Sequence, residues 1–219
     1  MKKTIGIIYL FLVAYIIVAC KPEQSAIFQD ESCSAPCWNQ ITPGETLLQG
    51  IDAKIKTIPG IDPKSLKIKT FLQMNDGIAF NFLSNAKESG GEIFSQNNIV
   101  EAIYFWPKTD TLSLSEGFQK WGSPDQYISI YYSSAEIPYL VTFIIYSDRG
   151  IVLLNMKTMS DSEVPKFEKN LQINGLWYTS AKLISTLLEN GVIGHIGNKD
   201  FTEGLKSWNG LKEIQYIKR

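Results

Sequence analysis

The chain alternates between stretches with the apolar spacing of a helix and stretches with the apolar spacing of a strand. After Thr42, a suitable helix N-cap, leucines and isoleucines recur every three or four residues as far as Ile58, and Pro59-Gly60 ends the pattern. Apolar or alternating runs follow at 66–74, 78–83 and 99–106, and each predicts a strand. Asn75-Asp76-Gly77 predicts a hairpin turn between the first two runs.

The same order recurs in the second half of the chain. A helical stripe at 111–121, capped by Ser113 or Ser115, is followed by a turn at 122–125 and by further apolar runs. Those runs predict strands at 127–132, 139–146 and 151–156, with a tight hairpin at 147–150.

The predicted fold is therefore α+β, with two successive units that each contain a helix followed by three antiparallel strands. The first unit covers 33–109 and the second covers 110–160. A C-terminal strand and helix extension covers the rest, 161–219. It is predicted to contain a strand within 167–177, helices at 180–188 and 201–208, and a strand at 211–217.

The N-terminus has the pattern of a secretory signal. Lys2 and Lys3 precede an apolar stretch that is short for a membrane span and ends at Cys20. Its last residues, Ile-Val-Ala-Cys, resemble a lipobox, and this resemblance implies cleavage of 1–19 and lipid on the Cys20 thiol. Residues 20–32 then predict a flexible tether, and the location is extracytoplasmic, anchored to a bacterial membrane. The alternative is an uncleaved anchor with an incidental cysteine.

The charge pattern argues against a nucleic-acid partner. Removal of Lys2 and Lys3 would change the formal net charge from −1 to −3, and no cluster of basic residues remains.

Cys33 and Cys37 remain as an even pair, and the favoured interpretation is a structural disulfide. A redox site is the first alternative, although its usual Cys-x-x-Cys spacing is one residue shorter. Zinc is the second alternative, but two thiols need two further ligands and His195 is the single histidine of the chain. No metal and no cofactor are predicted.

Catalytic chemistry has few candidates in this sequence. His195 lies in a loop-like stretch between two glycines, and no nucleophile-elbow, zinc-protease, phosphate-loop or dinucleotide motif is present. Acidic residues that could form a glycosidase pair are scattered over predicted turns and helix starts: Asp110, Glu116, Asp125, Glu136 and Asp148. We therefore expect a protein that is not an enzyme.

Aromatic residues supply the remaining signal. Alternate residues of a sheet covered on one side face outward, and tyrosine and tryptophan on an open face are typical of interfaces and of sugar-stacking surfaces. The candidate interaction surface consists of Trp106, Tyr127, Tyr131, Tyr132, Tyr139 and Tyr146. The alternative is that many of them fill the core.

Two segments resemble known families. The stretch 112–126 (LSLSEGFQKWGSPDQ) is similar to the helix and Gly-x-Pro turn of outer-membrane assembly lipoproteins of the BamE/SmpA type, with Trp121 in place of their leucine. The stretch 36–51, with Pro-Cys-Trp followed by Ile-x-Pro-Gly-x-Thr, resembles the start of uncharacterised bacterial lipoproteins. The tandem layout also resembles the β-lactamase inhibitor protein fold in architecture.

These observations favour a non-catalytic envelope lipoprotein, anchored to the membrane through Cys20, that acts as a protein-interaction or assembly module for an envelope partner. The alternative is an extracytoplasmic lipoprotein that binds a small ligand, either a sugar or a peptide. A hydrolase is the least favoured hypothesis.

Overall fold

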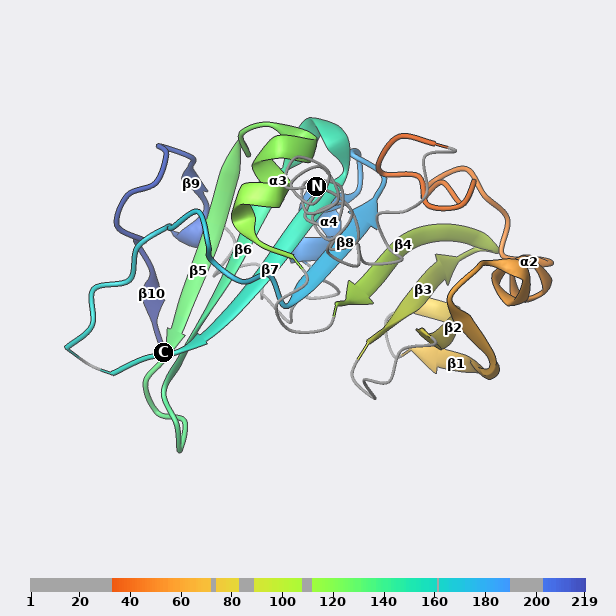
Figure 1. Cartoon of the computed structure of the whole chain (residues 1–219), viewed down its shortest axis with the longest axis horizontal. Coiled ribbons are helices and arrows are strands. Elements are labelled where there is room, and N and C mark those ends of the chain that lie inside the picture. The colour runs from red at the N-terminus through yellow and green to blue at the C-terminus, as the bar shows by residue number, and fades with distance from the viewer. Residues whose placement is uncertain (1–32, 72–73, 83–88, 108–111, 161, 190–202) are drawn as a thin grey trace, which may run out of the picture.

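The computed structural model describes residues 33–71, 74–82, 89–107, 112–160, 162–189 and 203–219 (Figure 1). The predicted signal peptide, Cys20 and the tether lie outside these ranges. The described residues form one ten-stranded sheet and three short α-helices. The helices are α2 (Ile51–Thr57), α3 (Leu114–Trp121) and α4 (Ile184–Glu189), and none in the described part is long and apolar enough to cross a membrane.

The strands follow the order β1-β2-β3-β4-β8-β7-β6-β5-β10 across the sheet, and β9 also pairs with β5. All pairings are antiparallel except the short β5–β10 pairing. In chain order the strands are β1 (Ile61–Phe71), β2 (Met74–Phe82), β3 (Gly90–Gln96), β4 (Ile99–Trp106), β5 (Gln126–Tyr132), β6 (Tyr139–Tyr146), β7 (Ile151–Thr158), β8 (Gly175–Thr179), β9 (Lys206–Ser207) and β10 (Ile217–Lys218).

The prediction of two helix-plus-three-strand units is wrong. Four strands follow α2, because the predicted polar stretch before Asn97 is strand β3. In addition, β8 comes after β7 in the chain but lies between β4 and β7, pairing with both. This insertion joins the two groups of strands into a single sheet.

The predicted N-terminal helix is shorter than its apolar spacing suggested. Residues 42–50 form turns held to β4 instead, since Gly44 N–H donates to the Val100 carbonyl at 2.7 Å and Val100 N–H donates to the Thr46 carbonyl at 2.8 Å. The helix begins only after Gly50, whose φ of 81° is a left-handed conformation that glycine adopts readily.

The second predicted helix is confirmed. Ser113 is the N-cap of α3: its hydroxyl accepts from Glu116 N–H, and the Glu116 carboxylate accepts from Ser113 N–H at 2.6 Å. This reciprocal pair is a capping box. The following strands β5, β6 and β7 lie where the sequence predicts them, and Gly150 ends the turn at 147–150 with φ of 64°.

The first hairpin exists, but its turn is displaced. Asp76 and Gly77 lie within β2 and pair with Ser95 and Phe94 of β3, so the β1–β2 connection falls at 72–73, outside the described residues. In the C-terminal part, the expected strand is the short β8 and the expected helix is α4. In the described part of 201–208, residues 203–204 are helical and 206–207 form β9, and the terminal strand is reduced to β10.

The sheet carries a hydrophobic core on each face. The face that packs against α2 and α3, here called the helix face, has as its largest fully buried side chains Trp38, Phe80, Phe105 and Tyr146. The other face, here called the opposite face, is built around Phe143, Ile128, Phe94 and Trp177 and is partly covered by Ile184 of α4. Both helices pack on this face, since their buried residues belong to the same hydrophobic cluster; Figure 1 shows α3 over β6 and β7 and α2 at the β1 end.

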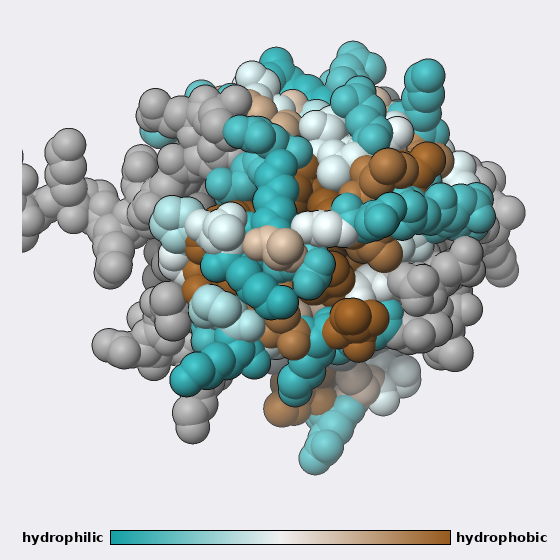
Figure 2. Space-filling model, turned by 90° about the vertical axis from the view of Figure 1, so that its right-hand side faces the viewer, coloured by the Kyte–Doolittle hydropathy of each residue, from teal (hydrophilic) through white to brown (hydrophobic). Residues whose placement is uncertain are grey.

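The free edge at β1 is charged. Lys67 and Lys69 are exposed there, and such lysines oppose edge-to-edge pairing with another sheet. Ile68 lies between them at 80% exposure, at the end of a cross-strand row that continues through Ile78 and Ile93. The end of the molecule formed by α2 and β1 accordingly shows apolar side chains among hydrophilic ones (Figure 2).

Candidate functional site

Three of the six predicted interface aromatics are in the core. Tyr127, Tyr131 and Tyr146 lie on the helix face and are buried, so they do not form an exposed surface. Segments distant in sequence cover them: Phe167 packs against Tyr127 at 4.9 Å between ring centroids, and Gln215 N–H donates to the Tyr127 hydroxyl at 3.3 Å. Because these covering segments have little regular structure, the strand pattern alone gave no sign of them.

Two of the other three residues form a patch at one end of the opposite face. Tyr132 and Tyr139 are directly opposed on β5 and β6, and their rings stack with centroids 4.9 Å apart at 22°. The Arg219 guanidinium lies 5.9 Å from the Tyr132 ring centroid. We call Tyr132, Tyr139 and the exposed neighbours Ile137 (64% exposed) and Met156 (49% exposed) the hairpin patch.

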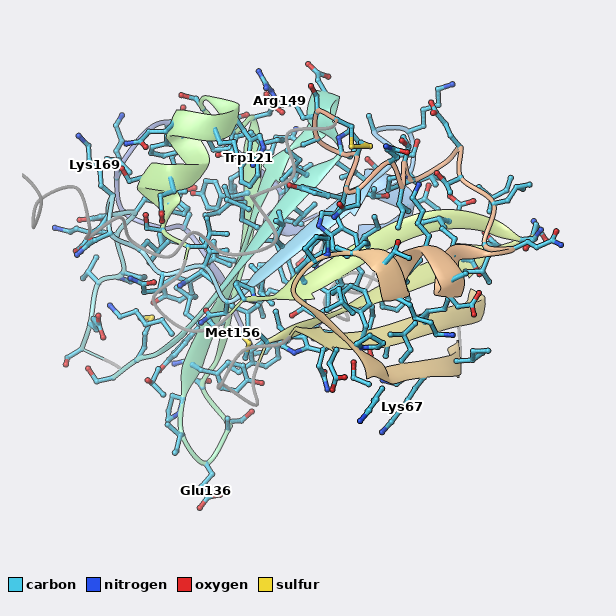
Figure 3. The ribbon with its side chains drawn as sticks, turned by 45° about the vertical axis from the view of Figure 1, so that its right-hand side comes forward. Lys67, Trp121, Glu136, Arg149, Met156 and Lys169 are labelled. Carbon is cyan, nitrogen blue, oxygen red and sulfur yellow. A yellow bond between two sulfur atoms is a disulfide. The ribbon has the colours of Figure 1, made fainter. Side chains whose placement is uncertain are left out.

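The hairpin patch projects from the molecule. The β5–β6 hairpin extends beyond the rest of the sheet in Figure 1, and Figure 3 places Glu136 at its tip. Met156 lies opposite Val141, which shares a face with Tyr139 two residues away, so Met156 continues the apolar surface onto β7. The chain thus presents apolar and aromatic groups on a protruding element.

The sixth predicted residue, Trp106, lies in the other half of the sheet beside residues that the sequence reasoning missed. Tyr104 is its neighbour on the same face, with ring centroids 5.7 Å apart, and Tyr104 stacks on Trp177 at 4.4 Å. Glu92 lies opposite Tyr104 across the β3–β4 pairing and accepts an ion pair from Lys69 Nζ at 2.6 Å. We call Tyr104, Trp106, Glu92 and Lys69 the tryptophan site.

The electrostatics of the tryptophan site keep its phenol protonated. Burial, with a smaller contribution from the Glu92 carboxylate, raises the pKa of Tyr104 to about 12. The Tyr104 phenol therefore keeps its proton at pH values where an ordinary phenol ionises. The signal that could have found this site is the pair of glycines at the start of β3, since glycine in a strand often marks close approach by another group.

The predicted disulfide is confirmed. Cys33 and Cys37 are bonded, with their Cα atoms 5.7 Å apart. Their loop lies beside the β6–β7 turn, because a Cβ on Gly150 would come within 3.2 Å of Pro36, and the yellow disulfide is visible near Arg149 in Figure 3. The described residues contain no group of three or more potential metal ligands.

Two of the predicted acids that the structure describes have local structural contacts, and two lie in turns. Glu116 caps α3, and Asp125 Oδ2 accepts from Ser147 N–H at 2.6 Å. Asp148 lies in the β6–β7 turn and Glu136 at the hairpin tip. Asp110, His195 and Cys20 fall outside the described residues.

A carboxylate that sequence reasoning did not single out is Glu101, which occupies an irregularity of the β3–β4 register. Its Oε2 atom is buried without a hydrogen-bond partner among the described residues, and burial raises its pKa.

The chain matches no known family model, no curated protein and no solved structure. The resemblances noted in the sequence therefore stay predictions.

Proposed function

We propose that this protein is a non-catalytic envelope lipoprotein whose hairpin patch binds an envelope protein. The observation that carries this proposal is the protruding β5–β6 hairpin, with its stacked Tyr132–Tyr139 pair beside the exposed Ile137 and Met156. Tyrosine and methionine are enriched at protein interfaces, and stacked tyrosines lose little conformational freedom on binding because they are already held in place.

The Cys33–Cys37 disulfide supports an extracytoplasmic location, because disulfides persist in oxidising compartments. It stands directly after the predicted tether at 20–32. Fully extended, residues 21–32 span about 40 Å, so lipid on Cys20 would confine the patch to a thin layer above the membrane. Such confinement raises the effective concentration of a partner in the same membrane.

The proposal is tested by photo-cross-linking in the native cell. A photoreactive residue is placed at Ile137, and the matched control is placed at Val164, an equally exposed apolar residue outside the patch (64% and 59% exposed). We expect a defined cross-linked protein from position 137 alone, and weaker cross-linking in a Cys20→Ser background. Equal products from both positions, or none from position 137, contradict the proposal.

Substitution separates binding from anchoring. Tyr139→Ala removes the stacked pair while Cys20 stays intact, and we expect it to weaken capture of the cross-linked protein roughly tenfold, as for loss of an interface aromatic. Membrane fractionation checks that the variant is still anchored.

A further inference from the structure

The tryptophan site lies in the β1–β4 half of the sheet, away from the hairpin patch. Its first feature is Gly90, which has no side chain. Gly90 pairs directly with Trp106, and a Cβ at Gly90 would lie 2.6 Å from one indole carbon and 2.8 Å from another. The Trp106 ring therefore occupies the space above Gly90, across β3. Trp106 is only half-buried in this position, so part of the indole remains open to solvent.

A polar pair borders the ring. Glu92 is two residues from Gly90 on β3, so its side chain lies on the same face as Trp106. Its carboxylate is held by the Lys69 ammonium at 2.6 Å, and both side chains stay partly exposed. An acceptor and a cationic donor thus stand beside the Trp106 indole, and the Tyr104 ring extends this aromatic surface toward β8, where its hydroxyl lies against Gly175.

This combination selects among ligand chemistries. A sugar hydroxyl can donate to the Glu92 carboxylate and accept from the Lys69 ammonium, so it can join both members of the ion pair without leaving either unpaired. The C–H groups on one face of a pyranose ring can pack against the indole. An anion would meet the Glu92 carboxylate, and a purely apolar side chain would cover the ion pair without replacing its contacts with water.

We propose that Trp106, Tyr104, Glu92 and Lys69 form a binding site for an uncharged sugar ring. This site goes beyond the proposed function, because it shares no residue with the hairpin patch. It would let one anchored protein contact a glycan through β1–β4 and a protein through the β5–β6 hairpin.

The test titrates the full chain carrying Cys20→Ser, in a detergent without a sugar headgroup, with soluble oligosaccharides. Maltotetraose, cellotetraose and the tetramer of N-acetylglucosamine are the probes, and tryptophan fluorescence and saturation-transfer NMR are the readouts. We expect at least one probe to bind with millimolar or tighter affinity. Absence of binding by all three overturns the proposal.

Variants locate the site. Trp106→Ala should weaken binding at least roughly tenfold, and Glu92→Gln should weaken it several-fold while leaving the fold intact. Trp208→Phe is the matched control, because Trp208 is also half-buried but packs on the helix face against Phe167 and Phe118. Tyr139→Ala should also leave sugar affinity unchanged. Sugar binding that survives both Trp106→Ala and Glu92→Gln places the ligand elsewhere and overturns the assignment.

Discussion

The two halves of the sheet differ in regularity. Every residue of the strands β5, β6 and β7 pairs in unbroken antiparallel register, and the turn between β6 and β7 is tight. From β1 to β4, the register shifts near Asp62, Lys69 and Phe94, and β3 opens with two glycines. The irregular half carries the tryptophan site, while the regular half carries the protruding hairpin patch.

This difference shows how one sheet provides two kinds of surface. Unbroken register gives a stiff ribbon that can extend beyond its support, as the β5–β6 hairpin does. Bulges and glycines leave room above the strands, and the Trp106 ring fills that room over Gly90. We therefore expect the regularity of strand pairing to determine which kind of surface each half forms. Because β8 pairs with both halves, we expect them to unfold together.

The largest expected effect comes from the core residues of each half. Trp38 stacks on Phe80 at 5.4 Å in the first half, and Phe143 is equally buried in the second. Trp38→Ala and Phe143→Ala should each lower the free energy of unfolding by about 3–5 kcal/mol. Because β8 joins the halves, urea denaturation followed by fluorescence and circular dichroism should show one transition that either change shifts. Two transitions, with only one of them shifted, would show independent halves.

Substitution of Gly150 tests the close contact between the β6–β7 turn and β8. A Cβ there would lie 1.9 Å from the Thr179 carbonyl oxygen, at a φ of +64°. Gly210 has a similar φ of +86° but open space around it. We expect Gly210→Ala to cost about 1 kcal/mol from backbone strain, and Gly150→Ala to cost a further 1–3 kcal/mol, roughly, from the clash. Equal losses in thermal or urea unfolding would show that the turn relaxes away from β8.

A substitution in the capping box of α3 tests how much one local hydrogen bond stabilises the regular half. Ser113→Ala removes the hydroxyl that accepts from Glu116 N–H and should destabilise the protein by about 1 kcal/mol. Ser115→Ala is the control, since the α3 N-cap is Ser113. A comparable loss in both variants would assign the effect to burial or helix propensity instead of capping.

The smallest effects come from one buried phenol in each half. Burial raises the pKa of both Tyr104 and Tyr146 above the ordinary value of 10.0, with Glu92 adding to the shift for Tyr104. A folded state that holds the phenolic proton more tightly than the unfolded state gains stability that is complete below pH 10 and is lost as the pH rises through the folded pKa. Stability should therefore fall above pH 10.

Tyr146→Phe removes a buried hydroxyl that has no hydrogen-bond partner among the described residues. At pH 7 we expect the free energy of unfolding to stay within about 1 kcal/mol of the wild type, and the alkaline loss to become smaller. Urea midpoints measured from pH 8 to 11 give both quantities. An unchanged alkaline slope in this variant and in Tyr104→Phe would show that neither phenol governs the loss.

Local signals in the sequence predicted the regular half well. The α3 cap, predicted at Ser113 or Ser115, and the strands β5 to β7 depend on neighbouring residues, and the structure has the cap at Ser113 and the strands within two residues of the predicted bounds. Strand β3 was missed because Gly90-Gly91 and its polar residues hide the apolar alternation. The central position of β8 was missed because strand order depends on pairings between distant segments, which periodicity does not encode.

The candidate sites were predicted only in part, for the same reason. Tyr132, Tyr139 and Trp106 are on the opposite face, but burial of Tyr127 depends on Phe167 and on the segment near Gln215, both far away in sequence. Tyr104 and Glu92 meet only through the β3–β4 register. Predicting the Cys33–Cys37 disulfide needed only the spacing of two cysteines.

The position of β8 also constrains the order in which the chain can fold. Until residues 175–179 have been synthesised, β8 cannot take its place between β4 and β7. The backbone groups of β4 and β7 that will pair with β8 stay open to wrong partners until then. The sheet therefore closes late, after most of the chain has been synthesised, through contacts of long sequence separation that make folding slow. A protein whose chain has to remain unfolded while it crosses a membrane would benefit from this delay.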